Sequence, residues 1–368
     1  MNLSIGQLFI VGIQGPALSS TEAEFLVTND IGGVILMGRN LTTPQELHKL
    51  CGTIQSLRSK TASKAPFFIA IDMEGGRVHR LKPPFTQWPS LAKLSKLDST
   101  SMAFKFANMM AEELRSVGIN LDFAPCVDVL TNPDNKLIGD RSLGSDPEQV
   151  AKMASALVRG YIKGGVIACA KHFPGHGHTI VDSHEELPID SLDLATLESR
   201  ELISFKKVFR ARIDMVMTAH IKYEKIDADN PATLSPVILQ KLLRENLRYR
   251  SLIISDDLDM KALVKYYPRE EIAVQAFKAG CDLLLYCNDP TSPPIALEAV
   301  RKALADGQLS QPLLIESLHR VATLKKESLA NCMPLPMNDA SKVIGHPEHL
   351  RVAKAINDGV IPEDLRNT

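Results

Sequence analysis

The sequence predicts a (β/α)8 barrel, a closed ring of eight parallel strands surrounded by helices. Two observations favour this fold class. Eight short apolar runs recur along the chain, and segments with the start and stop signals of helices lie between them. The runs are almost continuously apolar instead of alternating with polar residues, as expected for parallel strands covered on both faces. Strands and helices that alternate in this way form an α/β protein built on a parallel sheet.

Each predicted strand is a run of five to eight residues. The runs occupy residues 8–13, 32–37, 67–72, 121–125, 166–173, 215–220, 252–257 and 282–287. A doubly wound open sheet is the alternative arrangement of the same elements. No glycine-rich phosphate-binding turn follows the first run, which argues against a nucleotide-binding version of that sheet.

Helix boundaries are marked between the runs. Thr43 before Pro44 predicts a helix start, because a threonine side chain caps free backbone amides and proline fits the first helical position. A serine before Pro236 predicts a second start of this kind. Gly118 and Gly280 follow helical stretches and suit the position after a helix, where a left-handed conformation is common.

The chain after residue 290 predicts two further helices, within residues 293–330. The tail that follows is polar and contains proline, and one further helix is expected near residues 347–356. We therefore expect one barrel domain over residues 1–330 and a tail over residues 331–368, with one helix packed on the barrel.

The composition is typical of a soluble protein without a nucleic-acid-binding surface. Lys and Arg number 42 and Asp and Glu 43, so the formal net charge is only −1. Six scattered cysteines form no CxxC pair, which favours a reducing compartment. The N-terminus lacks the basic segment of a signal peptide, and no apolar run approaches the ~20 residues that span a bilayer. These features predict a cytoplasmic protein with no membrane partner.

Polar side chains come directly after the apolar runs, where a barrel gathers its reactive groups. They are Asp72, Asp128, Lys171, His172, His220, Asp256 and Asp257. Any one of them alone is explained as well by a capping residue or a hydrogen-bonded buried group. Their occurrence at several strand ends together predicts a functional site at this end of the barrel.

The Asp256–Asp257 pair predicts one reactive carboxylate. Adjacent residues on a strand point to opposite sides, so we expect only one of the two to face the site. A carboxylate there could act as a nucleophile or base if it stays ionised. Cations such as Lys171 or Arg141 would favour this by lowering its pKa.

Four of the ten histidines lie between residues 171 and 184. His176 and His178 form an HxH pair, and His172 lies four residues before His176, which leaves a metal-dependent hydrolase as one hypothesis. A proline and two glycines in this stretch exclude a regular helix that would align His172 with His176. A metal site at His172, His176 and His178 stays an alternative.

Asp182, Ser183 and His184 form a second pattern. In an extended loop, residues two apart project to the same side, so the Asp182 carboxylate can accept a hydrogen bond from the His184 ring. Such a bond would fix the ring tautomer and favour the protonated form. An Asx-turn with a solvent-exposed histidine is the competing interpretation, and spacing alone does not decide between them.

Five stretches, in order along the chain, complete the pattern. They are IDMEGGRVHRL (71–81), LDFAPCVDV (121–129), GDRSLGSDP (139–147), KHFPGHG with DSH (171–184) and SDDLDM (255–260). In these stretches the chain resembles glycoside hydrolase family 3, and more narrowly its single-domain bacterial β-N-acetylglucosaminidases that recycle cell-wall muropeptides. The resemblance covers about residues 5–330, and KHFPGHG followed by DSH is its most specific part.

The resemblance implies a (β/α)8 barrel and a retaining exo-glycosidase that removes terminal β-N-acetylglucosamine from muropeptide fragments. It implies that Asp256 is the nucleophile and that His184 is the general acid/base, assisted by Asp182. Residues implied to hold the hydroxyls of the terminal sugar are Asp72, Arg80, Arg141, Lys171 and His172. We expect a monomer with a small carbohydrate substrate and no cofactor, metal or nucleic-acid partner.

The chain also departs from the family pattern. Many relatives carry a small or acidic residue in place of His178, and the tail after residue 330 matches no motif. Larger members add a second α/β domain that supplies a glutamate as acid/base. Too little chain follows the barrel to build one, which favours the histidine mechanism.

Three alternatives to this glycosidase are considered. A metal-dependent hydrolase and a non-catalytic sugar-binding barrel both stay open. A substrate-assisted hexosaminidase would use an adjacent Asp–Glu pair at a strand end, and the sequence has none there.

Overall fold

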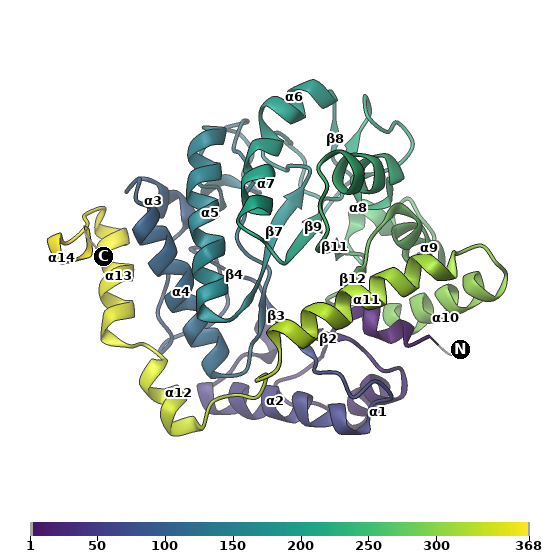
Figure 1. Ribbon diagram of the computed structural model, residues 1–368, viewed down its shortest axis with the longest axis horizontal. Helices are drawn as coiled ribbons and strands as arrows, with labels where there is room; N and C mark the ends of the chain where they lie inside the picture. The colour runs from purple at the N-terminus through teal and green to yellow at the C-terminus, as the bar shows by residue number, and fades with distance from the viewer. Residues whose placement is uncertain (1–2, 367–368) are drawn as a thin grey trace.

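The computed structural model describes residues 3–366. Its centre is a closed barrel of parallel strands in the order β1, β12, β11, β9, β7, β6, β3, β2 (Figure 1). The strands are β1 Phe9–Gly12, β2 Gly33–Ile35, β3 Phe68–Ile71, β6 Leu121–Asp122, β7 Ile167–Phe173, β9 Met215–Thr218, β11 Leu252–Asp257 and β12 Leu283–Tyr286. Each predicted apolar run contains one of them, and β1 pairs with both β2 and β12. The predicted barrel is confirmed and the open sheet is excluded.

Helices surround the barrel and cover the outer face of its strands (Figure 1). The longer ones are α1 Ser20–Thr28, α2 Pro44–Ser56, α4 Thr100–Ser116, α5 Pro147–Gly164, α7 Glu201–Arg210, α9 Arg269–Ala279, α10 Ser292–Ala305 and α11 Gln311–Ser328. The predicted boundaries agree with the structure. The Thr43 side chain accepts a hydrogen bond from the Glu46 amide, and Gly280 ends α9 in a left-handed conformation with φ 119°.

The helix predicted after Pro236 is a π-helix, η6, over Val237–Asn246 instead of an α-helix. Its start is as expected, since the Ser235 Oγ accepts a hydrogen bond of 3.1 Å from the Ile238 amide. Hydrophobic periodicity does not separate the two helix types over one or two turns, because both place apolar residues on one face.

The barrel interior is apolar at its amino-terminal end and polar at its carboxyl end. Every residue of β7 is buried, from Ile167 to Phe173. The strand therefore begins with apolar core residues and carries the buried polar side chains of Lys171 and His172 near its end. This explains why the sequence pattern is continuous and not alternating.

Short elements shape the loops at the carboxyl end. A β-hairpin of β4 (Met73–Gly75) and β5 (Val78–His79) follows β3 directly. A two-stranded sheet of β8 (Ile189–Asp190) and β10 (Lys222–Tyr223) ties the end of the loop after β7 to the loop after β9. A 3-10 turn, η4 (Gly139–Arg141), brings an arginine over the barrel mouth.

Up to residue 366, the tail contains three helices where the sequence predicted one. They are α12 Met337–Val343, α13 Pro347–Asp358 and α14 Glu363–Arg366. The predicted helix corresponds to α13, which lies with α12 against α4 on one side of the barrel (Figure 1). The division at residue 330 itself stays a prediction.

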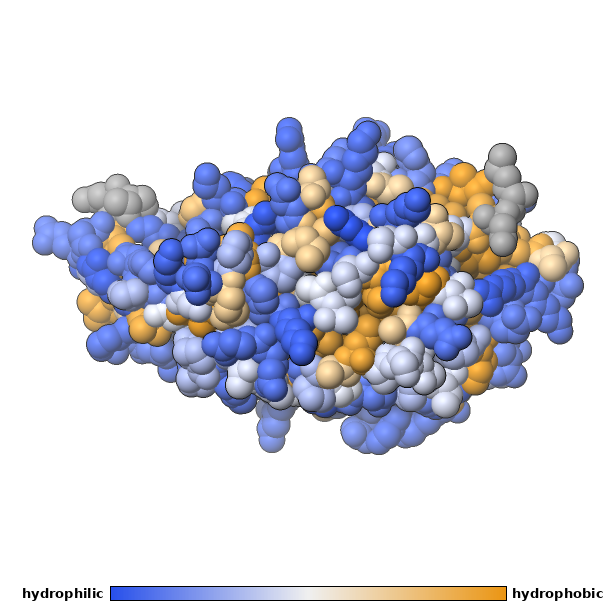
Figure 2. Space-filling model, turned by 90° about the horizontal axis from the view of Figure 1, so that it is seen from below, coloured by the Kyte–Doolittle hydropathy of each residue, from blue (hydrophilic) through white to orange (hydrophobic). Residues whose placement is uncertain are grey.

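Figure 2 shows one face on which hydrophilic side chains predominate and apolar residues gather in separate groups. Between residues 3 and 366, no helix combines the length and the apolar character needed to cross a bilayer. The most exposed large apolar side chain among the described residues is Ile180, in the loop after β7.

Candidate active site

A polar cavity opens at the carboxyl end of the barrel. Its volume is about 250 Å³, and its wall comes mainly from the segments after β3, β7 and β11 together with η4. Of the residues predicted for the site, these line it: Asp72, Arg80, Arg141, Lys171, His172, His184 and Asp256. Asp182 does not line this cavity but holds His184. The structure thus brings together residues that lie up to 184 positions apart.

One buried carboxylate connects the cations of the cavity wall. Glu74 Oε1 lies 2.8 Å from an Arg141 guanidinium nitrogen and 2.7 Å from Lys171 Nζ, and Glu74 Oε2 accepts a second bond of 2.8 Å from Arg141. Lys171 Nζ also lies 2.8 Å from Asp72, whose other oxygen is 3.5 Å from Arg80. Burial would raise the pKa of Glu74, but Arg141 and Lys171 hold it well below its usual range.

Glu74 was not among the residues predicted for the site. It lies in the IDMEGG stretch, two positions after Asp72, and it is only 1% exposed. The signal in the sequence was a second acidic residue at the same strand end. A buried carboxylate requires a charged or hydrogen-bonding partner. The burial of Glu74, which the sequence does not give, is therefore what identifies it as part of the site.

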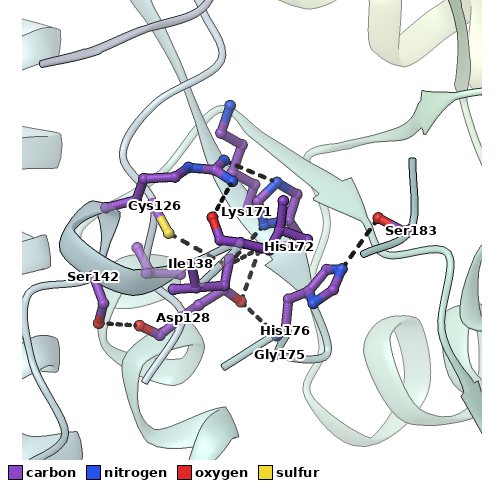
Figure 3. Close-up of polar contacts among 12 residues, drawn as sticks. Cys126, Asp128, Ile138, Ser142, Lys171, His172, Gly175, His176 and Ser183 are labelled. Atoms are coloured by element: carbon purple, nitrogen blue, oxygen red, sulfur yellow. Dashed lines mark hydrogen bonds and ion pairs between the residues drawn. The ribbon is translucent and has the colours of Figure 1, made fainter. Parts of the chain in front are cut away.

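Asp128 organises the two histidines at the end of β7 (Figure 3). Its carboxylate accepts bonds from His172 Nδ1 at 2.7 Å and from the His176 backbone amide at 2.7 Å. Burial opposes its charge, but His172 and His176 lower the pKa of Asp128 to about 2. Because an ionised carboxylate only accepts, the His172 proton sits on Nδ1, and Nε2 lies 3.5 Å from an Arg141 nitrogen.

The histidine metal centre considered from the sequence is not formed. His176 Nδ1 lies 2.7 Å from Thr179 Oγ1, and its Nε2 lies 3.3 Å from Ser183 Oγ. His178, half-exposed, bonds Asp190 at 2.9 Å instead. The spacing could not show that each ring turns to its own partner.

A different trio, Cys126, Asp128 and His172, is the one group of possible metal ligands within residues 3–366. Both Asp128 oxygens are already engaged by His172 and His176, and burial raises the pKa of the Cys126 thiol. A thiol must be deprotonated to bind zinc, so these contacts favour a structural role for the trio.

The two aspartates at the end of β11 have different partners. Asp256 Oδ1 accepts a bond of 2.8 Å from the Asp257 amide. Asp257 Oδ1 accepts the amides of Asp259 and Cys287, each at 3.1 Å. Both residues line the cavity, so the expectation that only one faces the site is wrong. Asp257 is nevertheless committed to the turn that follows the strand.

The two carboxylates also differ in the direction in which their pKa is shifted. Burial raises the pKa of Asp257 to about 6. For Asp256 burial acts in the same direction, but His220, His172, the Asp257 amide and Lys171 hold its pKa below the usual value. Of the two aspartates at the end of β11, Asp256 is therefore the one whose surroundings favour the ionised form.

His220 supports this strand end. Its Nδ1 lies 2.7 Å from Thr233 Oγ1, and its Nε2 lies 3.0 Å from the Asp257 carbonyl oxygen. The carbonyl can only accept, so Nε2 carries a proton, and burial lowers the pKa of the ring. This strand-end histidine positions the backbone next to Asp256.

The DSH tripeptide has features of both interpretations offered by the sequence, an Asx-turn and a bond between Asp182 and the His184 ring. Asp182 Oδ1 accepts the His184 backbone amide at 2.8 Å, as in an Asx-turn, and also lies 2.9 Å from His184 Nδ1. The His184 side chain is 63% exposed and faces the cavity with Asp256. Its Nε2 is therefore the nitrogen available for proton transfer.

The whole barrel is similar to known proteins. The sequence model described as the glycosyl hydrolase family 3 N terminal domain matches residues 1–324. The chain belongs to glycosyl hydrolase family 3. It is a glycoside hydrolase, as its five motifs implied.

Relatives and solved structures of the same family support this assignment. A protein named beta-hexosaminidase from Hydrogenovibrio crunogenus is 37% identical over 91% of this chain and 92% of its own length. A family 3 β-N-acetylglucosaminidase from a Paenibacillus strain has a TM-score of 0.89 at 32% identity, covering 98% of this chain and 69% of that one. NagZ from Neisseria gonorrhoeae, solved with N-trifluoroacetyl-D-glucosamine, has a TM-score of 0.77 at 30% identity over 96% of this chain and 98% of its own.

Proposed function

We propose that this family 3 hydrolase is a retaining exo-β-N-acetylglucosaminidase, with Asp256 as nucleophile and His184 as acid/base. One observation carries the proposal: Asp256 and His184, whose ring contacts Asp182, line a single cavity whose wall carries the predicted sugar-binding side chains. The names of the similar proteins support an N-acetylhexosamine as the sugar.

Asp256 meets the requirements of a nucleophile. A carboxylate must be ionised to attack the anomeric carbon, and the surroundings of Asp256 lower its pKa. Attack forms a covalent glycosyl–enzyme, which water then hydrolyses with overall retention of configuration.

His184 supplies the proton transfers. Protonated on Nε2, it donates to the leaving oxygen in the first step, and in the second step it removes a proton from the attacking water. The bond from Nδ1 to Asp182 stabilises the imidazolium and fixes the ring orientation. An imidazole can both donate and accept a proton near neutral pH, which suits this alternation.

The other side chains of the cavity wall suit a terminal sugar. Lys171, Arg80 and Arg141 present donors, and Asp72 presents an acceptor, so a ring with several hydroxyls finds both kinds of partner. Glu74 fixes the two most buried of these cations. His172 is held by Asp128 with its Nε2 toward the same side as Arg141. A cavity of about 250 Å³ favours one terminal residue over the interior of a polymer.

The natural substrate we propose is a muropeptide fragment with terminal β-N-acetylglucosamine, hydrolysed in the cytoplasm by a monomer without a cofactor. The support is the motif resemblance together with the ordinary charge balance. A non-catalytic sugar-binding barrel stays the second candidate. Turnover of an aryl β-N-acetylglucosaminide, unchanged by a chelator, would exclude both that candidate and a metal-dependent hydrolase.

Trapping of the intermediate tests the nucleophile directly. A 5-fluoro glycosyl donor slows hydrolysis of the glycosyl–enzyme, so peptide mass mapping reads the labelled residue. We expect the label on Asp256 and no label in an Asp256→Ala variant. Label on Asp257 or on any other residue would contradict the assignment.

A further inference from the structure

The loop that carries His184 is fastened to the segment that follows Asp256. Lys261 Nζ lies 2.6 Å from Glu185 Oε2, and Lys265 Nζ lies 2.9 Å from Glu186 Oε2. Lys265 Nζ also donates to the Glu185 carbonyl oxygen at 2.7 Å. These lysines belong to α8 (Lys261–Val264) and the residue after it, which follow β11 closely in the chain.

Two further bonds complete this connection. The Ala262 amide donates to the Ser183 carbonyl oxygen at 3.3 Å, and the Tyr266 hydroxyl donates to the Glu186 carboxylate. Residues on both sides of His184 therefore contact the same short helix. Inside the loop, the Glu185 and Glu186 amides donate to the Asp182 carbonyl oxygen at 2.9 and 3.0 Å, which joins the dyad to the fastened segment.

We propose that Lys261, Lys265 and Tyr266 form a latch that holds the His184 loop over the cavity and so controls proton donation to the leaving group. These are positioning residues, since they contact the loop and do not line the cavity. The inference rests on the proposed role of His184 as acid/base.

The exposure of the latch suits a device that opens in each catalytic cycle. The side chains of Lys261 and Glu185 are 51% and 69% exposed, and those of Lys265 and Glu186 are 44% and 45% exposed. Exposed ion pairs are individually weak and are screened by salt. The loop can therefore close on a bound sugar and still release the product.

The contacts beneath the loop do not replace the latch. His176 Nε2 lies 3.3 Å from Ser183 Oγ, a long contact to a ring whose pKa burial lowers to about 4. It holds the middle residue of the DSH tripeptide, whereas the latch holds the residues that follow the tripeptide. Without Lys261 and Lys265, the His184 side of the loop would be held by one backbone bond and by Tyr266.

Kinetics with two leaving groups tests the latch in the full-length protein. Because an activated dinitrophenyl glycoside needs little acid assistance and an N-acetylglucosamine disaccharide needs much, only the second reports proton donation. In the Lys261→Met/Lys265→Met variant we expect kcat/KM for the disaccharide to fall about tenfold, with less than about a twofold change for the activated glycoside. An equal loss for both substrates would overturn the proposal.

Three matched variants separate the latch from other effects. Lys152→Met removes the ion pair between Lys152, on α5, and Asp98, whose side chains are exposed to a similar degree as those of Lys261 and Glu185. This variant should leave both rates unchanged. The charge-swapped Lys261→Glu/Glu185→Lys variant, compared in the Lys265→Met background, should recover part of the lost rate. In a His184→Ala background the latch substitutions should cost nothing further, and an additional loss there would mean that they do not act through His184.

Hydrogen exchange gives a readout that does not depend on activity. The amides of Glu185 and Glu186 should exchange faster in the double-methionine variant than in the parent or in Lys152→Met. Unchanged exchange would overturn the latch. If instead His184→Ala lowers both rates equally while exchange still responds to the latch, the proposed acid/base role fails and the latch itself does not.

Discussion

Glu74 holds two cations of the cavity on one buried carboxylate. The side chains of Glu74, Lys171 and Arg141 are 1%, 3% and 10% exposed, so each charge is removed from water and depends on the others. Lys171 and Arg141 come from β7 and η4, far from Glu74 in the chain. The carboxylate therefore fixes three segments of the cavity wall at once.

Removal of this charge should be costly. In Glu74→Gln the amide keeps the shape but leaves Lys171 and Arg141 as neighbouring buried cations, and broken buried pairs cost about 3–5 kcal/mol. We expect a fall in the free energy of unfolding of about 3 kcal/mol and a raised KM. Urea titration and initial rates measure the two effects.

A nearby surface pair provides the control. Asp140→Asn breaks the pair of 3.0 Å between Asp140 and Arg77, whose side chains are both half-exposed. Such pairs are worth about 0–1 kcal/mol, so this variant should resemble the parent. Equal losses in the two variants would show that Glu74 has no special role.

Side-chain direction limits what the sequence reveals at this scale. Asp256, Lys171 and His172 were found because polar residues at strand ends are unusual, and all three line the cavity. Glu74 was missed, because its partners lie 67 and 97 positions away and no local pattern records them. The histidine spacing suggested a metal centre, but ring orientation depends on partners such as Asp190 that spacing does not contain.

At the scale of elements, the loop after β7 packs closely on the segment after β6. A Cβ atom at Gly177 would lie 1.7 Å from the Val129 carbonyl oxygen, and the Gly177 carbonyl accepts the Asn132 amide at 3.1 Å. The contact is backbone to backbone, so neither side can yield by turning a side chain. The glycine is required for close approach.

Gly177→Ala should push the loop off this surface and displace the His176 amide from Asp128. We expect the free energy of unfolding to fall by about 1–3 kcal/mol and activity to fall with it.

A glycine in α2 provides the control. The nearest atom to a Cβ at Gly52 is 3.9 Å away, so Gly52→Ala should stabilise the protein by up to about 1 kcal/mol. Thermal unfolding should therefore shift in opposite directions in the two variants, to lower temperature in Gly177→Ala and to higher temperature in Gly52→Ala, and only Gly177→Ala should lose activity. A neutral Gly177→Ala would contradict the packing argument.

Elements were the level at which the sequence was most informative. The barrel strands are continuous apolar runs, and capping signals at Thr43, Ser235 and Gly280 mark real helix boundaries. The π-helix and the extra tail helices α12 and α14 were not predicted. Both tail helices are short, and their position follows from packing against the rest of the protein more than from their own periodicity.

For the molecule as a whole, a buried histidine contributes to the contact between the tail and the barrel helices. His349 of α13 is buried, with Nδ1 3.2 Å from Glu113 and Nε2 3.3 Å from Glu112 on α4. Glu113 also accepts the Gly345 amide at 2.8 Å, which fixes the turn before α13. Since both ring nitrogens face carboxylates, both act as donors and the ring is cationic.

This arrangement predicts a loss of stability at alkaline pH. Burial opposes the charge, but Glu112 and Glu113 raise the pKa of His349 from 6.5 to about 9. A raised folded-state pKa means that the stabilisation is complete below pH 6.5 and is lost as the pH rises through about 9. Allowing for solvent screening, we expect about 1–2 kcal/mol.

A comparison of variants isolates this effect from other titrating groups. Burial lowers the pKa of Lys325 to about 7, and this group titrates in the same range with the opposite sign, because the folded state disfavours its charge. The informative quantity is therefore the difference between the parent and His349→Gln in the free energy of unfolding from urea titration. That difference should be largest below pH 6.5 and shrink toward pH 9, while the exposed His319→Gln control should show none. A difference that stays constant across this range would mean that His349 is neutral in the folded protein and that its contacts with Glu112 and Glu113 are not ion pairs.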